Sequence, residues 1–237
     1  MRTQLHSIHS DSLGRYYTNA VVSQALVADL PSNSPSTVLD LGCGTGSLSF
    51  AASRRWAKTN IVTVDLDRSI AQVLPDKLRE SGFAGGHYHL MFDALSPELA
   101  TSLRREKAQP DVAVCNPPFL VPKWKKGYSA ILEDVGLSSC LPAIATTDAA
   151  LVFLAQNLRL LQPGGILGII VPDSIVSADK YRNFRTELLN RYQIRSAIRL
   201  SRGSFGGTDA LAHILVIENS APNDAPIALS SLDKSGA

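Results

Sequence analysis

The chain has 237 residues, of which 45% are hydrophobic and 19% are charged, which is the balance of a globular protein. Its formal net charge of +2 is too small to indicate a nucleic-acid partner by itself. Three widely spaced cysteines, Cys43, Cys115 and Cys140, fit neither a disulfide framework nor a zinc site, and no metal site is predicted. No apolar run is long enough to span a bilayer and the polar N-terminus is no signal peptide, so we expect a cytoplasmic protein without a membrane partner.

The first segments predict a helix after a polar arm. Residues 1–13 are polar and unpatterned, and we expect them to form a flexible arm. Residues 20–30 place apolar side chains on one helical face, and either Thr18 or Asn19 is positioned to cap that helix.

A glycine-rich turn then separates a predicted strand (38–41) from a predicted helix (48–56), with Thr45 or Ser47 as the helix cap. Glycines let the main chain approach a ligand closely, and the start of a helix offers free N–H groups. The next strand (61–65) ends in Asp65, about 20 residues further on, which is the spacing at which an acid meets a ribose. Asp40 precedes the glycines and favours a ligand with a positive end over a pyrophosphate.

The third and fourth predicted strands, 87–93 and 111–115, follow predicted helices at 69–80 and 97–107, respectively. The third strand ends in Asp93, which is either a second strand-end acid that binds a ligand or a structural helix cap or loop acid. The fourth runs into Asn116-Pro117-Pro118-Phe119. Two prolines cannot continue a sheet ladder, so the tetrapeptide is either a turn or a stiff lip that grips a planar molecule bearing an NH2 group.

The second half predicts a loop, two helices and three strands. Lys123 begins a stretch of lysines and aromatic residues that is either a nucleic-acid contact or a solvated loop. Residues 127–147 have no clear period and are predicted as a lid or substrate loop. The remaining predicted elements are helices at 149–161 and 181–191, a strand at 166–172, and an antiparallel hairpin of strands at 194–200 and 211–217. Residues 220–237 are predicted as a tail or the start of a further segment.

The pattern Asp40-x-Gly42-x-Gly44-x-Gly46 resembles the first motif of class I S-adenosylmethionine-dependent methyltransferases. The resemblance implies an α/β fold: a Rossmann-like, doubly wound, seven-stranded sheet that is mostly parallel and ends in an antiparallel hairpin. It also implies that the glycine loop underlies the amino-acid end of the cofactor S-adenosylmethionine. In the same resemblance Asp65 holds the ribose and Asp93 takes the adenine amino group.

Asn116-Pro117-Pro118-Phe119 resembles the motif of methyltransferases that act on planar nitrogens. The resemblance implies that Asn116, which also borders the cofactor, and the Pro117 carbonyl accept the two amino hydrogens, while Phe119 stacks on the base. Phe205, in the hairpin loop, is either a second wall for the base or a hydrophobic plug.

Two flanking segments resemble adenine-N6 DNA methyltransferases of the gamma class. Gly14-Arg15-Tyr16-Tyr17-Thr18 is similar to a segment before their first motif, which implies that Tyr17 and Thr18 bind the cofactor, although Asn19 stands where that family has proline. Residues 181–217 are similar to the modification subunits of type I restriction systems.

The sequence therefore predicts a methyltransferase domain at residues 14–219 that methylates adenine N6 in DNA. We expect it to need a specificity subunit, a dimer partner or a further domain, because a duplex enzyme must read base edges and extrude its target base. The alternatives are an N-methyltransferase acting on RNA guanine or adenine or on a protein glutamine, and a non-catalytic scaffold that binds S-adenosylmethionine.

Overall fold

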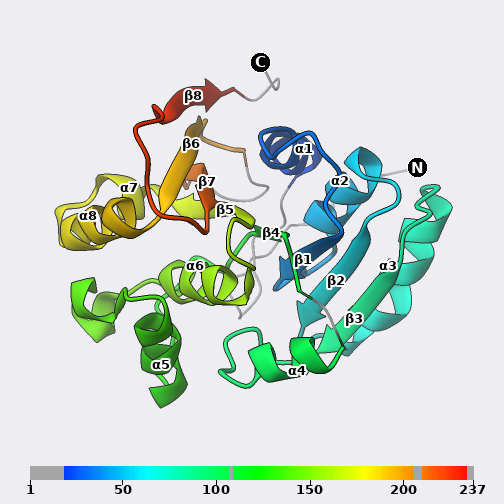
Figure 1. The fold of residues 1–237 in the computed structure, drawn as a ribbon, viewed down its shortest axis with the longest axis horizontal. Helices are drawn as coiled ribbons and strands as arrows, with labels where there is room; N and C mark the ends of the chain where they lie inside the picture. The colour runs from blue at the N-terminus through cyan, green and yellow to red at the C-terminus, as the bar shows by residue number, and fades with distance from the viewer. Residues whose placement is uncertain (1–18, 107–108, 205–209, 234–237) are drawn as a thin grey trace, which may run out of the picture.

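A computed structural model describes residues 19–106, 109–204 and 210–233, and these residues form an α/β fold around one sheet (Figure 1). Its eight described strands lie in the order β3-β2-β1-β4-β5-β7-β6-β8. The strands are β1 (Thr37–Leu41), β2 (Asn60–Asp65), β3 (His87–Met91), β4 (Val112–Cys115), β5 (Ile166–Pro172), β6 (Gln193–Leu200), β7 (Ala212–Glu218) and β8 (Ala228–Leu232). All pairs are parallel except those of β7 with β5 and β6. The predicted doubly wound, mostly parallel sheet is confirmed.

Helices cover both faces of this sheet. They are α1 (Ala20–Ala28), α2 (Ser47–Arg55), α3 (Arg68–Glu80), α4 (Leu99–Arg105), α5 (Lys126–Asp134), α6 (Ala149–Leu160), α7 (Asp173–Ser177) and α8 (Arg182–Arg191). Helices α1, α2 and α3 pack on one face, whereas α4 to α8 pack on the other (Figure 1). Strands β1 and β4 are neighbours although β2 and β3 intervene in the chain, so the strand order reverses between them. Open α/β sheets place ligands beside such a reversal, at the carboxyl ends of the strands.

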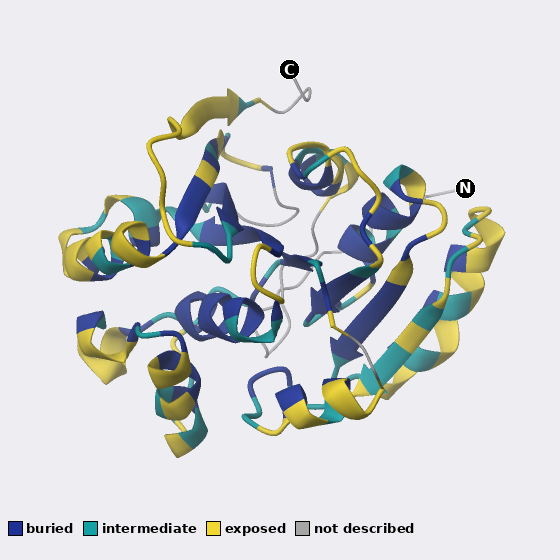
Figure 2. Cartoon of the chain, viewed as in Figure 1, coloured by how far each residue is buried: buried dark blue, intermediate teal, exposed yellow. Residues whose placement is uncertain are grey.

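The helix α6 forms the centre of the larger apolar core. Its first ten residues, from Ala149 to Leu158, are all buried (Figure 2). A helix that is apolar on every side is stable only when other elements surround it, as the sheet, α4 and α5 do here. The start of α6 is fixed by Asp148, whose carboxylate accepts the Ala150 N–H at 2.9 Å.

Three local predictions were wrong. The predicted tail contains β8, which adds an eighth strand through parallel pairing with β6. The predicted loop at 127–147 begins with α5, which buries Tyr128, Ile131 and Leu132. Neither Thr45 nor Ser47 caps α2. Its N-cap residue is Gly46, which has no side chain and so forms no side-chain capping hydrogen bond.

Within residues 19–106, 109–204 and 210–233, no helix has both the length and the apolar composition needed to cross a membrane.

Candidate functional site

The glycine loop joins β1 to α2 at the carboxyl edge of the sheet. Its three glycines, Gly42, Gly44 and Gly46, have φ values of 74°, 49° and 81°. Side chains with a Cβ rarely adopt this left-handed region, so the path of the loop requires glycine. The N–H groups of Gly42 and Cys43 both donate to the Val64 carbonyl, at 2.8 and 3.2 Å, which holds the loop against the end of β2.

Asp40 is buried beneath this loop. Its Oδ2 accepts from the Ser49 N–H at 3.0 Å and from the Ser49 hydroxyl at 2.6 Å, so Asp40 supplies an acceptor to the first turn of α2. Burial raises the pKa of Asp40 to about 7; the two Ser49 bonds oppose this shift, and the nearby Asp65 carboxylate adds to it. Asp40 also lines the cavity described below. A buried carboxyl of this kind favours a cationic group placed against it.

Asp65 ends β2 and is bonded to the same loop. Its Oδ2 accepts the Gly44 N–H at 2.9 Å, and its Oδ1 accepts the Asp67 N–H at 2.9 Å. Each carboxylate oxygen accepts in two directions, so both oxygens retain capacity for the hydroxyl groups of a ligand.

Asp93 follows β3 and has one partner on each oxygen. Oδ1 accepts the Leu95 N–H at 3.0 Å, and Oδ2 lies 3.0 Å from the ammonium nitrogen of Lys125. The hydrogen bond to Asp93 raises the pKa of Lys125, which therefore stays charged at neutral pH. The ion pair connects the end of β3 to the residue immediately before α5.

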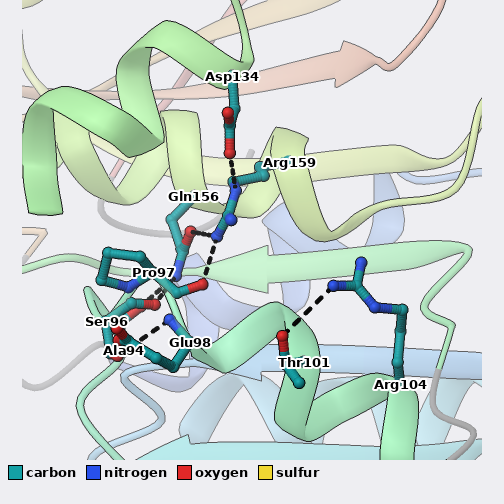
Figure 3. Close-up of polar contacts among 9 residues, drawn as sticks. All are labelled: Ala94, Ser96, Pro97, Glu98, Thr101, Arg104, Asp134, Gln156 and Arg159. Carbon is teal, nitrogen blue, oxygen red and sulfur yellow. Dashed lines mark hydrogen bonds and ion pairs between the residues drawn. The ribbon is translucent and has the colours of Figure 1, made fainter.

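The loop after Asp93 is held from behind by α6 (Figure 3). The amide of Gln156, which is fully buried, donates to the carbonyls of Ala94 and Ser96 at 3.1 and 2.8 Å. Arg159, one turn along α6, donates to the Pro97 carbonyl at 2.9 Å and pairs with Asp134 of α5 at 2.5 Å. These contacts fix the backbone that carries Asp93 relative to the core.

These elements enclose a cavity of about 520 Å³ at the carboxyl ends of β1, β2, β3 and β4. Its charged lining consists of four acids and Lys125, and its apolar lining includes Leu66, which is 68% exposed. The lining residues are Asp40, Gly42, Cys43, Gly44, Thr45, Ser47, Leu48, Asp65, Leu66, Asp67, Asp93, Ala94, Leu95, Asn116, Pro118, Leu120, Pro122, Lys125, Tyr128, Ala149 and Phe153. The cavity has the size and the mixture of apolar walls and a few polar groups that small-molecule sites have.

The cavity brings together most of the residues predicted to bind the cofactor. Asp40, Gly42, Gly44, Asp65, Asp93 and Asn116 line it, whereas Gly46, the N-cap of α2, is not among the lining residues. Tyr17 and Thr18 lie outside the described residues.

The residues predicted to act on the acceptor lie at different depths. Asn116 and Pro118 line the cavity, whereas Pro117 is buried. Phe119 is half-buried and packs against the apolar cluster beneath α1 and α2, and it is not among the lining residues. Lys123 is exposed and also outside the lining, and Phe205 lies outside the described residues.

Several site residues were not predicted from the sequence. Lys125 was visible only as one of several lysines, and Gln156 and Phe153 only as part of an amphipathic helix. Leu66 could have been predicted from the sequence, because it is a large apolar residue directly after the strand-end acid Asp65. It is exposed and lines the cavity.

Asn19, which stands where the resembled family has proline, links two distant segments. Its side-chain oxygen accepts the Val22 N–H at 2.8 Å and so caps α1, as predicted. Its amide nitrogen donates to the Ser204 carbonyl at 2.6 Å. The start of α1 is therefore tied to the segment that follows β6.

The two histidines of β3 form a polar pair at the edge of the sheet. The Thr63 hydroxyl lies 2.9 Å from Nε2 of His87 and 2.9 Å from Nδ1 of His89. Burial lowers the pKa of His87 to about 4, so the imidazole is neutral at pH 7. Among the described residues, no group of three or more His, Cys, Asp or Glu side chains has the arrangement of a metal site.

The strand order, the glycine loop and the strand-end acids together define a class I S-adenosylmethionine-dependent methyltransferase fold. The sequence model of the N-6 DNA Methylase family matches residues 4–231, and the chain belongs to this family. S-adenosylmethionine is the cofactor of these enzymes.

Similar proteins include a type II methyltransferase and a tRNA adenine-N6 methyltransferase. The chain is 26% identical to the type II methyltransferase M.BsuBI of Bacillus subtilis over 202 residues, which are 79% of this chain and 39% of that protein. It is 25% identical to a tRNA1(Val) (adenine(37)-N6)-methyltransferase of Shewanella halifaxensis over 187 residues, which are 76% of this chain and 66% of that protein. The chain thus spans less than two thirds of the length of M.BsuBI and slightly less than two thirds of the tRNA enzyme.

Solved structures share the fold. A modification subunit of a putative type I restriction enzyme from Vibrio vulnificus aligns with a TM-score of 0.69 at 21% identity, covering 95% of this chain and 50% of that one. A putative class I S-adenosylmethionine-dependent methyltransferase from Listeria monocytogenes aligns with a TM-score of 0.71 at 20% identity, covering 95% and 68%.

Proposed function

We propose that this chain is the catalytic core of an enzyme that transfers a methyl group from S-adenosylmethionine to the N6 amino group of adenine in DNA. The observation that carries the proposal is the position of Asn116. It follows β4 at the strand-order reversal and lines the same cavity as Asp40, Asp65 and Asp93. An amide that accepts amino hydrogens therefore borders the proposed cofactor site.

The described residues fit the cofactor in three ways. The buried carboxyl of Asp40 suits its cationic amino-acid end, and Asp65 has acceptor capacity for ribose hydroxyls. Asp93 and the exposed Leu66 offer an acceptor and an apolar surface for a planar amino-bearing ring. When bound, S-adenosylmethionine supplies an electrophilic methyl group.

The role of Asn116 follows from the chemistry of adenine. The N6 lone pair is delocalised into the ring, so the nitrogen is a poor nucleophile until its hydrogens are held out of the ring plane. The side-chain oxygen of Asn116 and the carbonyl of Pro117 would accept those two hydrogens and stabilise the positive charge that develops as the N–C bond forms. The proton leaves N6 after transfer, when the nitrogen is cationic, so no strong base is needed. Phe119 packs against the core in this structure, so it would have to move locally before it could stack on the base.

DNA is favoured as the acceptor by the family and by the relative from Bacillus subtilis. The tRNA enzyme from Shewanella halifaxensis supports adenine in RNA as the second candidate. We further propose that site recognition comes from a partner subunit or from additional segments. The support for this is that the chain matches 39% of M.BsuBI and half of the Vibrio vulnificus modification subunit.

The experiment is methyl transfer from S-adenosylmethionine labelled in the methyl group to separate pools of duplex DNA, RNA and protein. We expect label in DNA, released as N6-methyladenine on digestion. Label only in RNA would replace the DNA proposal by its second candidate. Label only in protein, or in none of the pools while the cofactor still binds, would contradict both candidates.

A further inference from the structure

Seven basic residues lie between positions 180 and 202, and most of them have partners within the protein. Arg182, Arg191 and Arg195 pair with Asp179, Glu187 and Glu218, respectively. Lys180 donates to the Thr146 carbonyl, and Arg185 donates to the carbonyls of Ile175 and Ala178. These contacts give five of the seven cations a structural role, and Arg199 is not among them.

Arg199 differs from these five cations in that its guanidinium has no hydrogen bond or ion pair within the described part of the chain, and it is exposed on β6. Its neighbour in the sheet register is His213, whose pKa is lowered by burial, with Arg199 contributing to the shift. The Nδ1 atom of His213 lies 3.7 Å from a carboxylate oxygen of Asp173.

Arg199 also lines a second cavity, of about 310 Å³, at the carboxyl ends of β6 and β8. Arg202 and the residues Ser201 and Ser231 share this lining, together with one acid, Asp233. The remaining lining residues are Leu200, Leu211 and Leu232. The guanidinium of Arg199, close to a second arginine and two serine hydroxyls, gives this lining groups that suit a phosphate.

The sheet register places this second cavity level with Asn116. Cys115 is opposite Ile169, so Asn116 is level with Ile170, and Arg199 is level with Val171 through His213. The strands β4 and β6 run in the same direction and are three steps apart. At about 4.8 Å per step, the two backbones are about 15 Å apart along one edge of the sheet. The phosphates of one strand of a duplex repeat every 3.4 Å of helix axis, so this distance measured along the axis is about four nucleotides.

We propose that Arg199, at the mouth of the cavity it shares with Arg202, binds a backbone phosphate of the nucleic-acid acceptor a few nucleotides from the adenine held at Asn116. This inference rests on the proposed function, because it assumes a nucleic-acid acceptor. It assigns Arg199 a binding role that carries no sequence information, since phosphate contacts set position and base contacts set specificity.

The test compares Arg199→Gln with Arg195→Gln in the full chain. Both positions are exposed on β6, but Arg195 is already paired with Glu218, so its loss leaves the nucleic-acid affinity unchanged. Binding to a short duplex DNA and to an RNA of the same sequence is measured over a range of salt concentrations, with cofactor affinity and methyl transfer measured alongside. For Arg199→Gln we expect affinity weaker by on the order of fivefold and a salt dependence reduced by about one ion, with cofactor affinity unchanged.

The outcomes separate the site from the proposed function. An unchanged salt dependence in Arg199→Gln, or an equal change in Arg195→Gln, overturns the phosphate site even if methyl transfer to DNA occurs. A reduced salt dependence without methyl transfer to any nucleic acid supports the phosphate site and overturns the proposed function. Failure of the unaltered chain to bind either nucleic acid overturns both.

Discussion

Lys125 and Asp93 form an ion pair across the lining of the proposed cofactor cavity, with 3.0 Å between the ammonium nitrogen and Oδ2. Asp93 is the proposed acceptor for the adenine amino group of the cofactor, and its Oδ1 already accepts the Leu95 N–H. Lys125 takes one of the two acceptor directions of Oδ2, and its positive charge makes this oxygen a weaker acceptor for the cofactor. The ion pair therefore links the loop after Asn116 to cofactor binding.

Replacing Lys125 by Met should tighten cofactor binding up to about fivefold, because the competing cation is removed and a partly exposed pair of this kind is worth about 1 kcal/mol or less. Calorimetric titration with S-adenosylmethionine measures the effect, and Lys126→Met is the matched control. A tenfold loss of affinity in Lys125→Met alone would show instead that the ammonium group itself binds the cofactor.

The raised pKa of Asp40 predicts a pH-dependent contribution to stability. The folded-state pKa of about 7 lies above the ordinary value of 3.8, so the stabilisation from the protonated carboxyl is fully present below about pH 4. That contribution is lost as the pH rises through 7, because the buried group must then ionise. Asp40→Asn keeps an oxygen acceptor for Ser49 but cannot ionise. It should therefore remove this part of the loss of stability with rising pH. Urea unfolding of both proteins at pH 5 and pH 8 measures it; an identical pH dependence in the two proteins would contradict the assignment.

The same group predicts proton release on cofactor binding. A cationic amino-acid end placed against Asp40 lowers its pKa, so below about pH 7 the carboxyl loses its proton as the ligand binds. We expect cofactor affinity to rise with pH between 5 and 7, and binding heats to depend on the ionisation enthalpy of the buffer. In Asp40→Asn both dependences should be smaller. A buffer-independent binding heat at pH 6 for the unaltered protein would count against a cation at this position.

Asn116→Ala should abolish methyl transfer while cofactor binding persists. The amide is proposed to act on the amino hydrogens of the acceptor, and removing such a hydrogen-bond acceptor at a developing charge lowers rates by roughly 100-fold or more. Transfer of labelled methyl groups and calorimetric titration with S-adenosylmethionine are the two measurements. If cofactor affinity falls together with activity, Asn116 acts mainly on the cofactor or on folding.

Gln156→Leu should loosen the loop that carries Asp93. The substitution removes two hydrogen bonds and leaves the buried carbonyl of Ala94 and the half-buried carbonyl of Ser96 without these donors, at about 1–3 kcal/mol for a buried group left unpaired. We expect weaker cofactor binding and a lower free energy of unfolding, measured by titration and by urea unfolding. Asn157→Leu is a control, because that amide donates within α6 to the Phe153 carbonyl. The two variants should differ in cofactor affinity, and equal affinities would mean that Gln156 contributes only to folding.

Short-range patterns determined much of this protein. The apolar runs of β1, β2 and β4, the glycines between Asp40 and Ser47, and the acids at strand ends predicted the fold class and the acids and glycines that line the cavity. These signals are visible in sequence because each depends on its own few residues: a glycine for a positive φ, an apolar run for a buried strand. The same logic explains the failures, because β8 is exposed along nearly its whole length and has no apolar signal, so its pairing depends on the free edge of β6.

Only the tertiary structure decided which side chains meet. Lys125 and Asp93 are 32 positions apart, Gln156 reaches a loop 60 positions before it, and Asn19 bonds to Ser204 across 185 positions. Likewise, Arg195 and Arg199 look alike in sequence on β6, yet Arg195 pairs with Glu218 of the neighbouring strand and Arg199 has no such partner among the described residues. Hydrogen bonds and ion pairs act over about 3 Å, so their partners follow from how the layers pack around the sheet and not from the order of residues along the chain.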